Sequence, residues 1–109
     1  MSVGIEEAVK LHSNGNDVEA LKFYIDNLRS DSPDLRAFIN APVLLRKKGE
    51  IEQAIRILKA GIKLYPKEPG LYNNLGNAQS DLLKYSEAII NYRKCINLDY
   101  INLVYNINL

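Results

Sequence analysis

The sequence repeats itself every 34 residues, and this period restricts the fold more than any other feature. Ala20, Ala54 and Ala88 occupy the same position in three successive copies. The neighbouring positions also agree in type, as shown by Glu19, Gln53 and Glu87 before them and by Leu21, Ile55 and Ile89 after them. Units of this length are typically pairs of helices that bury their apolar faces only against neighbouring copies. The sequence therefore predicts a solenoid of stacked helix pairs.

Apolar side chains follow a helical spacing within each copy. In the third copy Ala88, Tyr92 and Cys95 lie at i, i+4 and i+7, which is the spacing of one helix face. Gly49 closes the basic turn Arg46, Lys47 and Lys48, as a glycine at a helix C-terminus does, and Asn14-Gly15 has the same place in the first copy. We expect helices near residues 3–13, 17–30, 35–48, 51–64, 70–83 and 86–98.

The third copy also carries the residues of a known repeat. Residues 71–78 read Leu-Tyr-Asn-Asn-Leu-Gly-Asn-Ala, and Tyr85, Ala88 and Tyr92 follow at fixed offsets. This pattern resembles the tetratricopeptide repeat (TPR), which implies an all-α fold, a right-handed TPR solenoid of antiparallel helix pairs. The second and first copies match from Gly49 and Gly15 onward. The departures from the pattern are Pro42 where Gly76 stands, Gln79 for Tyr, Gly61 and Cys95 for Ala, and Tyr100 for Pro.

The repeat phase predicts a single TPR domain over residues 1–109. We expect repeats at about residues 1–34, 35–68 and 69–102, with residues 103–109 as the start of a truncated fourth repeat. The residues from Ile101 onward are mostly apolar, whereas the end of a solenoid normally carries a polar cap. This pattern predicts self-association through the C-terminal end. The alternative is a short terminal helix that docks on the third pair.

The segment around Pro42 can form a helix in two ways. A continuous helix over residues 35–48 would lack the hydrogen bond from position 42 to the Phe38 carbonyl and would bend to avoid a clash. Alternatively the helix starts late, with Asn40 as its N-cap and Pro42 in the first turn. The repeat phase favours the continuous helix.

The sequence offers little material for catalysis. It contains one histidine, His12, and one cysteine, Cys95, which cannot form a zinc cluster or a paired Cys/His nucleophile within one helix. Its six glycines form no phosphate-binding motif. A formal net charge of +1 disfavours general binding to nucleic acid, and no stretch has the roughly 20 apolar residues of a membrane helix. We therefore expect a cytoplasmic protein that is not an enzyme and uses no cofactor or metal.

Recognition of a protein or peptide is the function that remains. The first helix of each pair would line a concave groove, and Asn40 and Asn74 lie there one repeat apart, in a row that Asn108 would extend. An amide can pair with a peptide backbone because it offers both a donor and an acceptor. The alternative is that asparagine is simply abundant, with twelve in the chain. The candidate groove residues are Arg36, Ile39, Asn40, Val43, Lys47, Asn73, Asn74, Asn77 and Asp81.

The resemblance to TPR proteins implies two kinds of groove. Chaperone adaptors hold the acidic C-terminus of heat-shock chaperones in a clamp of Lys, Asn and Arg, and only Asn40 agrees among the matching positions Ile5, Val9, Asn40, Gly70 and Asn74. O-GlcNAc transferases carry an asparagine row in their TPR superhelix, which Asn40 and Asn74 match. The start of the chain is also similar to bacterial TPR arrays. The alternative function is therefore the N-terminal array of a larger glycosyl-, sulfo- or methyltransferase.

The second copy is basic. Residues 35–68 contain eight lysines and arginines against three glutamates, a net charge of +5. An acidic partner could bind this charge, but Arg56, Lys59 and Lys63 belong to the second helix and are expected to face outward. Since no row of aromatic residues accompanies the charge, a solvated convex face is favoured over a nucleic-acid site.

Overall fold

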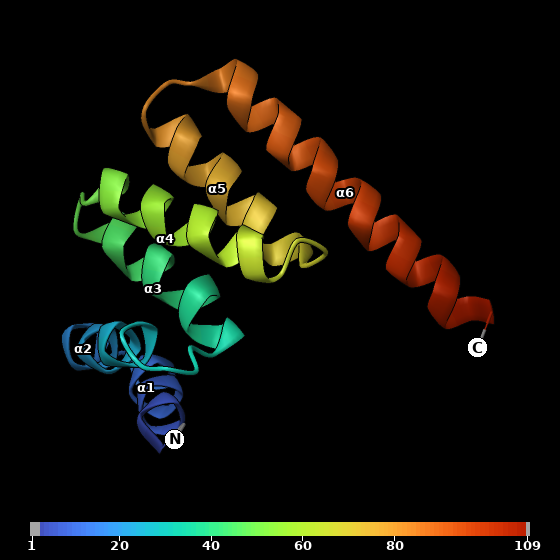
Figure 1. Cartoon of the computed structure of the whole chain (residues 1–109). Coiled ribbons are helices and arrows are strands. Elements are labelled where there is room, and N and C mark those ends of the chain that lie inside the picture. Colours follow the sequence, from blue (N-terminus) through green and yellow to red (C-terminus); the bar gives the residue numbers. More distant parts are fainter. Residues whose placement is uncertain (1–2, 109) are drawn as a thin grey trace.

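The chain folds into six α-helices arranged as three antiparallel pairs (Figure 1). The computed structural model describes residues 3–108, and the side chains of residues 4–103. The helices are α1 (Val3–Ser13), α2 (Asp17–Leu28), α3 (Leu35–Lys47), α4 (Ile51–Leu64), α5 (Pro69–Asp81) and α6 (Tyr85–Asn108). The pairs stack because α2 packs on α3 and α4 packs on α5, and α3 also contacts α5 directly. Residues 3–108 contain no strand, so the all-α solenoid expected from the repeat is confirmed.

Small residues set the distance between the helices. Ala20, Ala54 and Ala88 are 0%, 0% and 1% exposed, because they lie where paired helices meet. The approach is closest in the third pair, where a Cβ added at Gly76 would lie 2.7 Å from Cε1 of Tyr92. Larger side chains at such positions would hold the helix backbones apart. The residues that define the repeat are therefore the residues that allow the helices to pack.

Helix α3 runs without a break through Pro42, from Leu35 to Lys47. Its N-cap is Asp34, whose side-chain carboxylate accepts a hydrogen bond from the Arg36 backbone N–H at 2.8 Å. The continuous helix is therefore confirmed, and the late start with Asn40 as N-cap is wrong. Pro42 is fully buried, so packing compensates for the hydrogen bond that it cannot donate.

Helix α6 departs most from expectation. We expected it to end near residue 98, but it continues to Asn108 as a helix of 24 residues. The expected end is wrong because Tyr100 stands where a TPR usually has proline, and tyrosine does not stop a helix. Figure 1 shows the C-terminal half of α6 extending beyond the other helices. The assignment of residues 103–109 to a fourth repeat stays a prediction, and Leu109 lies outside the described residues.

The turn that joins the two helices of each pair contains one residue with a left-handed backbone conformation. Gly15 and Gly49 have φ angles of 81° and 83°, as expected for glycines that follow a helix. One repeat later the same position is Leu83, with a φ angle of 62°. Glycine adopts this conformation freely, whereas a residue with a Cβ is strained in it. The third pair therefore keeps the turn geometry without the residue that suits it.

Replacing Leu83 with glycine is expected to raise the free energy of unfolding by about 0.5–1 kcal/mol, because the backbone strain is removed. The Leu83 side chain is 70% exposed, so its loss removes little buried area. The reciprocal change Gly49→Leu is expected to lower the free energy of unfolding by about 1–2 kcal/mol. Urea denaturation of both variants tests the pair, and a destabilised Leu83→Gly protein would contradict the argument.

Candidate functional site

A groove lies between the C-terminal ends of α3 and α5. It has a volume of about 580 Å³ and is lined by Val43, Arg46, Lys47, Ile51 and Asp81. Val43, Lys47 and Asp81 were expected there from the sequence, and the contact between α3 and α5 brings them together. We call this hollow the α3–α5 groove. Its lining mixes apolar side chains with opposite charges, which suits a partner of mixed polarity.

Arg46 and Asp81 form a two-bond ion pair in this groove. The Arg46 Nε donates to Asp81 Oδ2 at 2.7 Å, and Nη2 donates to Oδ1 at 3.0 Å. The hydrogen bonds from Arg46 hold the pKa of the Asp81 carboxyl below its ordinary value, and those to Asp81 raise the pKa of Arg46. Sequence reasoning did not include Arg46 among the groove residues. The two residues are 35 positions apart, so the repeat period does not align them.

The two cations that the sequence predicted for the groove, Lys47 and Arg36, also have carboxylate partners. Lys47 Nζ lies 3.2 Å from Asp17 Oδ2, which joins α3 to the start of α2. Arg36 Nη2 lies 3.2 Å from Glu6 Oε1 of α1 and 3.0 Å from Asp34 Oδ2. The hydrogen bonds from Arg36 also lower the pKa of Asp34. The predicted cations therefore link successive repeats, and their charge is compensated within the chain.

A second hollow lies between α1 and α3. It has a volume of about 320 Å³ and is lined by Val9, His12, Ser13, Tyr24 and Asn40. The buried Tyr24 hydroxyl accepts a hydrogen bond from Asn40 Nδ2 at 3.1 Å and lies 3.2 Å from His12 Nδ1. Burial raises the pKa of Tyr24. Sequence reasoning did not predict this polar cluster.

The side chains of Asn40 and Asn74, which form the asparagine row, each donate a hydrogen bond to another group of the chain. Asn40 donates one N–H to Tyr24, and Asn74 Nδ2 donates to the Ile39 carbonyl at 2.9 Å. Among the described residues neither amide oxygen accepts a hydrogen bond from the protein. Each amide thus keeps an acceptor and a second N–H for a ligand. The side chain of Asn108, which would extend the row, lies outside the described side chains.

Of the remaining candidate residues, Ile39 is half-buried and packs against the core, whereas Asn73 and Asn77 lie toward α6. The Asn77 amide oxygen accepts a hydrogen bond from the Tyr92 hydroxyl at 2.6 Å. Asn73 is exposed, and its backbone lies beside the Cys95 thiol of α6. Asn73 and Asn77 therefore belong to the contact between α5 and α6 and are not joined to the α3–α5 groove.

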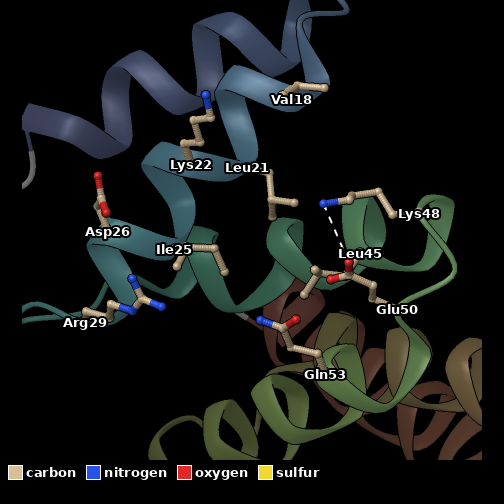
Figure 2. Close-up of a pocket in the computed structure, with 10 residues that line it drawn as sticks. All are labelled: Val18, Leu21, Lys22, Ile25, Asp26, Arg29, Leu45, Lys48, Glu50 and Gln53. Atoms are coloured by element: carbon tan, nitrogen blue, oxygen red, sulfur yellow. Dashed lines mark ion pairs between the residues drawn. The ribbon is translucent and has the colours of Figure 1, made fainter.

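A further hollow lies on the side of the second helices (Figure 2). It has a volume of about 310 Å³, and Leu21 and Ile25 of α2 face Leu45 of α3 across it. An ion pair between Lys48 Nζ and Glu50 Oε1, at 3.7 Å, lies at its border. The sequence did not predict this hollow, because its apolar residues follow the helical spacing of residues that pack against a neighbouring helix.

Neither a metal centre nor a membrane span emerges from the described part of the chain. No group of three or more His, Cys, Asp or Glu side chains is arranged there to hold a metal ion. No helix among the same residues combines the length and the apolar composition needed to cross a membrane. The fold and its hollows define a helical-repeat protein with surfaces for a partner.

Comparison with known families identifies the repeat. A model described as TPR repeat matches residues 44–82, and a model described as tetratricopeptide repeat matches residues 69–102. Together they span residues 44–102, more than half of the chain. The chain therefore belongs to the tetratricopeptide repeat family, and it is a protein–protein interaction module by class.

Several solved structures share the fold. The MamA MSR-1 C2 structure matches with a TM-score of 0.82 and 16% identity, over 93% of this chain and 58% of that one. The first TPR of Spaghetti (RPAP3), bound to the HSP90 peptide SRMEEVD, matches with a TM-score of 0.81 and 21% identity, over 88% of this chain and 76% of that one. The Sgt2 TPR domain from Aspergillus fumigatus matches with a TM-score of 0.78 and 20% identity, over 88% and 64%.

These identities establish a shared fold and nothing finer. The chain spans little more than half of the MamA chain. No curated protein matches it by sequence. None of the matches described above is a transferase, so the alternative function as a transferase array has no support from them.

Replacing Asp81 with asparagine is expected to lower the free energy of unfolding at pH 7 by about 0.2–1 kcal/mol, the range of partly exposed ion pairs. The Asp81 pKa is lowered in the folded protein, so its contribution is complete above the ordinary aspartate pKa of about 3.9 and is lost as the pH falls through the lower folded value. The difference in free energy of unfolding between the native protein and the Asp81→Asn variant is therefore expected to be smaller at pH 3 than at pH 7.

Urea denaturation at pH 7 and pH 3 measures this difference. Asp31→Asn is the matched control, because Asp31 is exposed in a turn and has no ion pair in the described part of the chain. An Asp81→Asn effect that is equally large at both pH values would show that the ion pair is not its cause.

Proposed function

We propose that the concave surface lined by α1, α3 and α5 binds an extended peptide or partner segment through the ligand's backbone. The observation that carries this proposal is the state of Asn40 and Asn74, which lie one repeat apart and each keep an amide oxygen without a protein partner among the described residues. Packed helices lie about 8–10 Å apart, and an extended peptide advances about 3.3 Å per residue. The two amides therefore suit backbone groups about three residues apart.

The compensated charges of the surface support recognition of the backbone rather than of acidic side chains. Arg36, Arg46 and Lys47 each have a carboxylate within 3.2 Å. An acidic ligand would have to compete with these internal partners. The first and second TPRs of Spaghetti are each bound to the HSP90 peptide SRMEEVD. The positions that match a chaperone clamp here include Ile5, Val9 and Gly70, which carry no charge. We therefore propose a ligand that need not be acidic.

The α3–α5 groove would supply the specificity that the amides lack. Val43 and Ile51 offer apolar contact, and the Arg46–Asp81 pair offers a fixed polar border. A ligand with an apolar side chain near the backbone segment bound by Asn74 would fill this groove. In the same proposal the protein is a non-enzymatic, cytoplasmic, bacterial scaffold that uses no cofactor and self-associates through the apolar end of α6.

Peptides selected from a random display library against the full chain provide the ligand for the test. Asn40→Ala and Asn74→Ala are each expected to weaken binding by about 0.5–1.5 kcal/mol, or roughly two- to twelve-fold, with little dependence on salt. Arg46→Ala and Lys47→Ala are expected to have smaller effects. Isothermal titration calorimetry at low and high salt measures all four.

Asn97→Ala is the matched control, because Asn97 is exposed on α6 away from the concave surface. Circular dichroism must show that Asn74→Ala keeps its fold, since it also loses the bond to the Ile39 carbonyl. Binding that ignores both asparagine changes but falls strongly with Arg46→Ala or Lys47→Ala at low salt would refute the backbone mechanism. Such a result would favour the basic second copy as the binding surface.

A further inference from the structure

Helix α6 carries an apolar stripe that no other described element covers. Its members recur at helical spacing and point to one side of the helix. They are Tyr85, Ile89, Ile96, Tyr100 and Leu103, with exposed fractions of 58%, 47%, 68%, 65% and 57%. We call these five residues the α6 stripe. Because α6 packs chiefly against α5 through another face, the stripe stays open from Tyr85 to Leu103.

The repeat shows what this face does in the other pairs. Ile55 lies one repeat before Ile89 and is only 8% exposed, because it packs against Leu71 and Leu75 of α5. Leu21 lies two repeats before Ile89 and is also 8% exposed, within the first core cluster. The same position therefore receives a helix in the first two pairs. In the third pair the surface has the composition of a helix contact, and no helix among the described residues covers it.

The size of the stripe is sufficient for a partner. Together its five residues expose a total surface on the order of 600 Å², the two tyrosine hydroxyls included, which is comparable with the largest apolar patches of ordinary monomers. Two such faces pressed together would bury on the order of 1,200 Å², which is the lower end of the range for stable protein interfaces. Complete mutual burial of the two stripes therefore brings a second copy of the chain to this lower limit.

The opposite end of the solenoid decides how a second copy can bind. A head-to-tail stack would place α1 of the next chain on the α6 stripe, as α5 lies on α4. Glu7 and Lys10 of α1 correspond by two repeats to Leu75 and Ala78 of α5, and both are exposed and charged. Stacking would bury these charges against Ile89 and Ile96 without partners, which is unfavourable. The N-terminal face is therefore unsuited to this contact.

We propose that the α6 stripe is the interface of a two-fold symmetric dimer, in which α6 of one chain packs on α6 of a second copy. Both helices then bury apolar residues against apolar residues, and the contact is complete with two chains. This inference rests on the proposed self-association, but it is independent of peptide binding on the concave surface. The N-terminal ends stay free in such a dimer.

Sedimentation of the full chain over a concentration series tests the inference. We expect a monomer–dimer equilibrium that reaches two copies and does not grow further. Ile96→Glu is expected to raise the dissociation constant at least ten-fold, because it puts a charge in the centre of the stripe. Ile90→Glu is the matched control, since Ile90 is 52% exposed on α6 but lies on another side of the helix, and it should leave the dimer unchanged.

Three outcomes would overturn the proposal. These are a monomer at every concentration, assemblies that keep growing beyond two copies, and equal effects of Ile96→Glu and Ile90→Glu. If Ile96→Glu does not fold by circular dichroism, Leu103→Glu tests the same stripe nearer the C-terminal end of α6. Peptide affinity measured on the Ile96→Glu protein keeps the two proposals apart, because it is expected to equal that of the native chain.

Discussion

A single helix pair of this chain cannot bury its own apolar face, and every other feature follows from the close stacking that this requires. Ala20, Ala54 and Ala88 allow the approach within each pair, and Leu21 and Ile55 complete the contact with the next pair. Stacking at this distance brings α3 against α5. Only then can Asn74 reach the Ile39 carbonyl and Arg46 reach Asp81. The α3–α5 groove is therefore a product of the packing, and a change that loosened the core would also disperse this groove.

The sequence predicted the features that repeat and missed those that do not. The period located six helices, and the continuous α3 through Pro42 followed from the phase of the neighbouring copies. The period alone gave the wrong end for α6, because the substitution of Tyr100 for the usual proline removes the stop signal and was not used to extend the helix. The left-handed turn at Leu83 is the exception among the repeated features: Leu83 aligns with Gly15 and Gly49, but it was missed because leucine itself gives no local sign of a positive φ angle.

The candidate site was harder to predict than the fold for a related reason. The composition placed a charge of +5 in the second copy, but it did not reveal that Arg36, Arg46 and Lys47 have partners in other copies. Such pairings depend on side-chain conformations across a helix contact, and the residues concerned are 30 or 35 positions apart. The contacts of Tyr24 were hard to predict for the same reason. Its position in the repeat indicates a buried side chain and gives no sign that its hydroxyl joins His12 to Asn40. Leu58, one repeat later, has no hydroxyl, so the second copy cannot form the same cluster.

The ion pairs that join successive repeats also bear on the mechanics of the solenoid. Glu6–Arg36, Asp17–Lys47 and Arg46–Asp81 connect the first copy to the second and the second to the third. All three lie at the surface, so salt weakens them while the buried leucines and alanines are unaffected. Bending the superhelix would lengthen these links one after another without opening the core. We therefore expect ionic strength to control the elasticity of the array. A change in elasticity would also change the width available to a bound segment.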